Sequence, residues 1–320
     1  MDLIEVLLAG GPVVVAGLGL ALAERVLAGA TPAPVRVARR MQPLGAVAAL
    51  AALTLDAGGP AGALAAVWLA VCLCAAVGGV VVALRLRHLA PEVEGGPAPL
   101  LAGTVAVGLA YLGVGGVWFV ISRLGLHPLD LSTDVVRLTA VHFHYAGFAL
   151  PVMAATGLAA VDFYASRVSL VTGCMAAVVG PFVVAMGIAL DAAVLRIGGA
   201  LVMTVAAWSV AFGTFLLSTS NSALTSVPVR GRGVVQMVGR WLLVVSSLSP
   251  VVPMLLALQW AVAQHSGVPS LATADMASTH GLLNGIGFVM GGLAGWLLTG
   301  AVTAPPSRTA EVGGPGGTGQ

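Results

Sequence analysis

Unbroken apolar runs, each about as long as a bilayer is thick, recur along nearly the whole chain and constrain its fold more than any other feature. Hydrophobic residues make up 58% of the 320 residues and charged residues only 8%, whereas soluble domains carry about 25% charged residues. Too few polar side chains remain to cover a water-exposed surface, which excludes a cytosolic enzyme, a nucleic-acid-binding protein and a disordered chain. A transmembrane β-barrel would alternate polar and apolar residues in segments of about ten residues. The sequence therefore predicts an all-α, polytopic bundle of transmembrane helices.

Nine apolar segments qualify as membrane spans, because a helix needs about 20 apolar residues to cross the hydrocarbon core. The shortest is the second, which ends at Asp56, Gly58 and Gly59. We expect one transmembrane domain over residues 1–304 and a disordered, Pro/Gly-rich cytoplasmic tail at 305–320. The spans are placed at residues 8–28, 41–57, 61–84, 100–122, 134–161, 168–189, 193–217, 236–262 and 276–302.

The basic residues, all of which are arginine, are distributed unequally between the two sides of these spans. Cytoplasmic loops concentrate positive charge, so the side with more arginines is assigned to the cytoplasm. Only Arg123, Arg137 and Arg196 fall on the other side. This predicts a multi-pass protein of the bacterial cytoplasmic membrane, with the N-terminus outside and the C-terminus in the cytoplasm. The cytoplasmic set is Arg25, Arg36, Arg39, Arg40, Arg85, Arg87, Arg167, Arg230, Arg232, Arg240 and Arg308.

Charge and cysteine content bear on cofactors and partners. The formal net charge of +2 is too small to favour a polyanionic partner such as nucleic acid. Cys72, Cys74 and Cys174 lie within apolar runs and show neither a disulfide framework nor a metal-ligand spacing. We therefore assign no cofactor and no metal. The expected partners are a lipid-soluble small-molecule substrate and membrane lipids, and the oligomeric state is left open.

Two of the predicted spans carry polar residues that are costly inside a bilayer and usually face a bundle interior or a wet cavity. The fifth span contains His142, His144 and Tyr145, and the ninth contains His280 and Asn284. Both spans start on the outer side, which places these residues roughly 6–15 Å deep at 1.5 Å per residue. We expect them to share one pocket in the outer half of the membrane.

The spacing of these residues assigns them to faces of their helices. His280 and Asn284 are four positions apart and project together. His142 and His144 diverge by about 200° on a regular helix, so one can face the pocket while the other meets a neighbouring helix. Imidazole is a common metal ligand, so a haem or metal protein is a third alternative. It ranks below the other two because two diverging rings cannot bind one ion. Each histidine can also simply form a hydrogen bond between helices.

Two acidic residues on the outer side are candidates for a proton donor. Asp130 precedes the fifth span, and Asp191 joins the sixth and seventh spans near Arg196. Acid-initiated cyclisation begins when a proton reaches an alkene or an epoxide, and it needs a positioned acid, a dry cavity and a group that takes the final proton. Asp191 is equally interpretable as a loop cap. The groups expected to orient the acid or act as base are His142, His144, His280 and Tyr145.

The two polar motifs together resemble the YndJ-like family of bacterial membrane proteins. They read His-Phe-His-Tyr-Ala-Gly-Phe at 142–148 and His-Gly-Leu-Leu-Asn-Gly-Ile-Gly-Phe at 280–288. Members carry a transporter label, so the resemblance implies a multi-pass membrane protein and transport. In size and character the chain is also loosely similar to actinobacterial membrane-bound terpenoid cyclases. The residues carried over from the YndJ-like family are His142, His144, Tyr145, Gly147, His280 and Asn284.

Two functions follow as the main hypotheses. The first is an intramembrane, metal-independent cyclase, of the isomerase or lyase type, that acts on a prenylated or terpenoid substrate. The chain lacks the paired Asp-rich motifs of enzymes that ionise diphosphates. The second is a transporter or exporter of a small hydrophobic molecule, which glycine-rich helices and proline kinks favour. Against transport, no internal repeat is visible and no carboxylate lies securely at the midplane.

Overall fold

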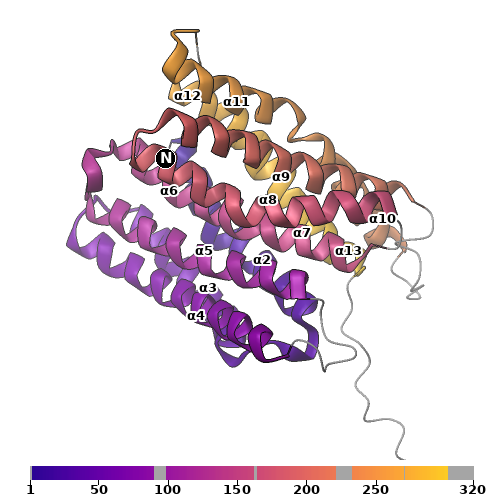
Figure 1. The fold of residues 1–320 in the computed structure, drawn as a ribbon. Helices are drawn as coiled ribbons and strands as arrows, with labels where there is room; N and C mark the ends of the chain where they lie inside the picture. Colours follow the sequence, from indigo (N-terminus) through magenta and orange to yellow (C-terminus); the bar gives the residue numbers. More distant parts are fainter. Residues whose placement is uncertain (1, 90–98, 162–163, 221–232, 270, 302–320) are drawn as a thin grey trace, which may run out of the picture.

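The computed structural model describes residues 2–89, 99–161, 164–220, 233–269 and 271–301. Within these ranges the chain is helical, with short connections and no strand. Figure 1 shows the long helices running side by side in one bundle, with their connections at its two ends. The tail predicted at 305–320 lies outside the described residues.

Eight helical stretches are long and apolar enough to cross a membrane, which confirms the predicted polytopic bundle. Four of them are interrupted or subdivided along their length. The stretch at Thr133–Ala159 is the most deeply buried of the eight, so the first polar motif lies in the centre of the bundle. The stretches are Leu3–Ala30, Gly59–Leu86, Pro99–Leu124, Thr133–Ala159, Tyr164–Ala189, Ala193–Thr219, Gly233–Ser266 and Ala277–Thr299.

Helix α3 (Ala33–Leu53) corresponds to the second predicted span but begins earlier than predicted. A proline near its first residue has a backbone angle suited to a helix start. Its first half carries Arg36, Arg39 and Arg40, so it is too charged to count among the eight apolar stretches. It packs along α4 (Gly59–Leu89). That α3 crosses the membrane, and that the N-terminus lies outside, stay predictions.

The remaining elements follow the chain in order, and three neighbouring helix pairs, α3–α4, α4–α5 and α8–α9, pack most extensively. A break at Ser249 and Pro250 separates α10 from α11. The bounds are α1 (Leu3–Gly10), η1 (Gly11–Val15), α2 (Ala16–Leu27), η2 (Ala28–Ala30), α5 (Pro99–Leu124), η3 (Pro128–Asp130), α6 (Thr133–His142), η4 (Phe143–Ala149), α7 (Leu150–Ala159), α8 (Tyr164–Ala189), α9 (Ala193–Thr219), α10 (Gly233–Leu248), α11 (Val251–Ser266), α12 (Thr273–Met276), η5 (Ala277–Gly281), η6 (Leu283–Met290) and α13 (Gly291–Thr299).

Four of these short segments, η1, η4, η5 and η6, are π-helical. The sequence predicts regular helices here, and the structure differs because each segment forms a wider turn than an α-helix does. Segment η4 covers the first polar motif from Phe143 onward, and η5 with η6 covers most of the second. Segments η1, η4 and η6 contact one another. The two motifs and the N-terminal helix therefore form one irregular region. Turns of this kind are frequent at functional sites.

Candidate functional site

Helix α1 brings the two motif-bearing helices together. The Tyr145 hydroxyl donates a hydrogen bond to the carbonyl oxygen of Leu7 at 2.9 Å. A methyl group added at Gly285 would lie 3.0 Å from the Leu7 side chain and 3.3 Å from the Tyr145 ring. Leu7 therefore contacts Tyr145 from the first motif and Gly285 from the second. The two motifs are neighbours in space, with the N-terminal helix packed against both.

Both ring nitrogens of His144 have partners inside the bundle. The indole N–H of Trp68, on α4, donates to Nε2 at 3.1 Å, and Nδ1 lies 2.8 Å from the carbonyl oxygen of Ala140. Because Nε2 accepts, Nδ1 carries the proton and donates it. The His144 and Trp68 rings stack with centroids 5.9 Å apart. His144 is thus a fully paired side chain that joins η4 to α4.

His280 and Asn284 form a second group with α11. Nδ1 of His280 lies 2.8 Å from the carbonyl oxygen of Pro253 and donates to it. The Asn284 amide nitrogen then donates to Nε2 of His280 at 3.4 Å, and the same nitrogen lies 3.4 Å from the sulfur of Met254. The four-residue spacing predicted the pairing of His280 with Asn284. The contacts to Pro253 and Met254 carried no signal in the sequence.

Two buried polar atoms beside this group have no hydrogen-bond partner among the described residues. They are Nε2 of His142 and Oδ1 of Asn284. The rings of His142 and His280 are close enough to interact electrostatically. Buried polar atoms are paired in the great majority of cases, so each exception calls for an explanation such as a ligand. We name His142, His280 and Asn284 the histidine–asparagine cluster.

The two predicted acids lie apart from the histidine–asparagine cluster. Asp130 is exposed in η3, and its φ of 54° is in the left-handed region. Asp191 lies between α8 and α9 with 87% of its side chain exposed, and it pairs with Arg196 at 2.6 Å. The structure therefore joins His280 to Asn284, places His142 within electrostatic range of His280 and Tyr145 against α1, and leaves both acids on exposed segments.

An ionic group that the sequence did not predict lies at the end of the bundle where α1 begins. The guanidinium of Arg137 pairs with Asp2 at 2.6 Å and lies 3.5 Å from both Glu5 and Asp134. Slight burial raises the pKa of Asp2, but hydrogen bonds from Arg137 and the Glu5 backbone N–H, with the arginine charge, lower it below its ordinary 3.8 overall. An arginine inside a predicted span was the one signal that a partner must lie nearby.

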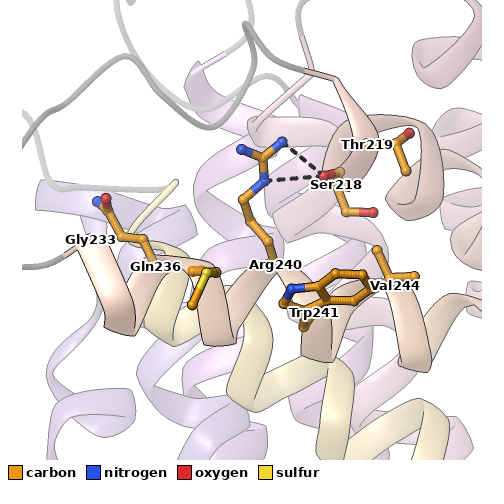
Figure 2. A pocket seen from close by; sticks show the side chains of 8 residues that line it. Ser218, Thr219, Gly233, Gln236, Arg240, Trp241 and Val244 are labelled. Carbon is orange, nitrogen blue, oxygen red and sulfur yellow. Dashed lines mark hydrogen bonds between the residues drawn. The ribbon is translucent and has the colours of Figure 1, made fainter.

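Two further features bear on ligands. Within the described ranges, no three His, Cys, Asp or Glu side chains come together as a possible metal-ligand set. A hollow of about 470 Å³ lies between α9 and α10 at the opposite end of the bundle, and none of the predicted site residues lines it (Figure 2).

The fold and the cluster define a multi-pass helical membrane protein with a buried polar cluster between its N-terminal helix and two motif-bearing helices. The family described as YndJ-like protein matches residues 6–288, and the chain belongs to this family. Over 132 residues the chain is 31% identical to the uncharacterized membrane protein YndJ of Bacillus subtilis (strain 168), an alignment that covers 38% of this chain and 24% of that relative. No solved structure matches the chain.

Proposed function

We propose that the chain is a membrane enzyme that binds a lipid-soluble substrate at the histidine–asparagine cluster and transfers a proton there. The observation that carries the proposal is the unpaired Nε2 of His142, buried beside His280. A buried imidazole without a partner is available to a reacting group, because no protein hydrogen bond has to break first. Asn284 offers an unpaired carbonyl oxygen, which can accept a hydrogen bond from a substrate hydroxyl group and orient it.

The reaction that we propose is cyclisation of a prenylated or terpenoid substrate. Protonated His142 gives its Nε2 proton to an epoxide oxygen, the adjacent C–O bond breaks, and an internal double bond supplies the electron pair of the new C–C bond. The resulting cation loses a C–H proton to Nε2 of His280, which gives up its hydrogen bond from Asn284, and return of this proton to His142 restores the site. One proton enters the substrate and one leaves, so the product is an isomer of the substrate. Histidine takes the role first expected of an aspartate, because Asp130 and Asp191 are exposed.

Transport of a small hydrophobic molecule is the second candidate, and one observation favours it. The helices around the cluster are irregular, with π turns in η4, η5 and η6 and a break at Pro250 between α10 and α11. Broken helices at membrane depth commonly line the substrate paths of transporters.

An assay of membranes from cells that express the chain distinguishes the two. Epoxidised and non-epoxidised farnesylated substrates are supplied, and products are followed by mass and retention time. We expect an isomer of the epoxide, with unchanged mass, that is lost in His142→Ala and Asn284→Ala membranes. His265→Ala is the matched control, because His265 is exposed near the end of α11.

Each alternative outcome has a defined meaning. Unchanged substrate that accumulates inside sealed vesicles, and does so less in His142→Ala vesicles, would support transport instead. Cyclisation that persists in both cluster variants would show that the histidine–asparagine cluster is not the site of proton transfer.

A further inference from the structure

The hollow between α9 and α10 has a polar side and an apolar side. It lies where α9 ends and α10 begins, and its volume is about 470 Å³. Figure 2 shows Gln236 and Arg240 projecting from the same side of α10, with Trp241 beside the base of Arg240. The full lining is Ser218, Thr219, Gly233, Gln236, Met237, Arg240, Trp241 and Val244.

Arg240 is held in a fixed position at the polar side. Its Nε and Nη2 atoms donate to the carbonyl oxygen of Ser218 at 3.2 and 3.1 Å, and Nη2 also donates to that of Ser220 at 3.0 Å. These carbonyls close the C-terminal end of α9, where a cation is favourable. A guanidinium has five N–H donors; these bonds use three of them, and the two on Nη1 can donate to a phosphate oxygen. Arg240 thus holds a positive charge at the edge of the hollow.

The apolar side of the hollow faces outward from the bundle. Met237 and Trp241 are 53% and 64% exposed, although they lie in a helix apolar enough to span the membrane. Such side chains contact lipid, and tryptophan is enriched where acyl chains meet headgroups. An occupant of the hollow would therefore contact a charged group on one side and hydrocarbon on the other.

The surrounding end of the bundle is basic. Arg25, near the end of α2, donates to the carbonyl oxygen of Leu297, and Arg85 of α4 donates to that of Ala30. Both arginines hydrogen-bond to neutral carbonyls, so these bonds leave their charges uncompensated. Glu24 is the acid that pairs with Arg39 here. Basic pockets between transmembrane helices bind anionic lipid headgroups.

We propose that the hollow is a binding site for an anionic phospholipid. The phosphate lies against the guanidinium of Arg240 and the side-chain amide of Gln236, and the acyl chains lie along Met237 and Trp241. This site is independent of the histidine–asparagine cluster and of the function proposed for it.

The test measures lipid retention and stability of the purified chain in detergent. Phosphatidylglycerol and phosphatidylcholine are added separately, and bound lipid is counted by native mass spectrometry while unfolding is followed by heating. We expect phosphatidylglycerol to be retained and to raise the Tm, phosphatidylcholine to do neither, and inorganic phosphate at the same concentration to leave the Tm unchanged.

The variants separate binding from folding. Arg240→Gln removes the charge but also the bonds that close α9, so Gln236→Glu is the main variant: it places a negative charge in the hollow and leaves Arg240 in place. We expect Gln236→Glu to reduce phosphatidylglycerol retention at least threefold. The matched control is Arg196→Gln, at the other end of the bundle. Equal retention of the two lipids, retention unchanged by Gln236→Glu, or a Tm increase that inorganic phosphate alone reproduces would overturn the proposal.

Discussion

Two histidines only two positions apart in the chain differ in the contacts of their rings. His144 has a partner on each ring nitrogen and stacks on Trp68, whereas Nε2 of His142 is buried and unpaired. Their sequence neighbourhood predicted that the two rings point to different surroundings. It could not assign the roles, because the partner of His144 lies 76 positions away on α4. The same residue type therefore serves packing at one position and is available for chemistry at the other.

Replacing each histidine with alanine separates these roles. His144→Ala leaves the buried Trp68 N–H without its acceptor and opens a cavity, which is expected to cost at least about 2 kcal/mol of stability. His142→Ala removes an unpaired buried nitrogen and is expected to cost less than about 1 kcal/mol. Thermal unfolding of the purified variants in detergent measures both. A larger loss in His142→Ala than in His144→Ala would contradict the assignment.

The Asp2–Arg137 pair makes stability depend on pH. The pKa of Asp2 is lower in the folded chain than its ordinary value of 3.8. Its contribution is therefore complete above about pH 4, and it is lost as the pH falls below 3.8 through the lowered value. Because 55% of the Asp2 side chain is exposed, the effect is at most about 1 kcal/mol. We expect Asp2→Asn to lower the Tm less at pH 3 than at pH 7, and an equal difference at both values would refute it.

At the scale of elements, the apolar runs predicted where helices lie, because a bilayer leaves a spanning backbone no other way to pair its polar groups. They did not predict the π turns of η1, η4, η5 and η6. A π turn depends on how its helix packs against neighbouring helices. The residue types of the segment alone do not reveal that packing. The start of α3 was also missed, since arginines in its first half were interpreted as part of a loop.

Close packing at the end of α1 is testable with a pair of glycines. A methyl group at Gly10 would lie 2.4 Å from the Tyr145 hydroxyl and 2.5 Å from the terminal carbon of Met290, whereas nothing lies within 4 Å of one at Gly198 in α9. We expect Gly10→Ala to cost about 1–3 kcal/mol through overpacking. Gly198→Ala is expected to gain about 0.5–1 kcal/mol from its better helix propensity. Tm values of the two variants measure the difference, and equal shifts would rule out the close contact.

At the scale of the whole molecule, the unequal distribution of arginines predicted an orientation that the fold accommodates. The described arginines of the predicted cytoplasmic set lie toward the end of the bundle opposite the start of α1. The site was predicted less fully. The sequence predicted one pocket for His142, His144, Tyr145, His280 and Asn284. It could not predict that His144 pairs with Trp68, or that Leu7 and Pro253 contribute, because these contacts depend on which helices meet.

Reporter fusions test the orientation and the status of α3. We expect a fluorescent protein fused after residue 301 to fluoresce and alkaline phosphatase at the same place to be inactive, since that end is predicted to be cytoplasmic. If α3 crosses the membrane, phosphatase is inactive after Ala30 and active after Asp56. The same result at both positions would mean that α3 stays on one side.

The position of Leu7 has a consequence for biosynthesis. Its carbonyl oxygen bonds to Tyr145, 138 positions later in the chain, and its side chain packs against Gly281 and Gly285 in the last described stretch. The helix that carries Leu7 therefore completes its contacts only after the stretch that carries Gly281 and Gly285 has been made. Until then the part of its surface that meets Gly281 and Gly285 has only lipid or transient partners. A nascent chain halted before residue 280 lacks His280 and Asn284, so the histidine–asparagine cluster forms only after the stretch Ala277–Thr299 has been made.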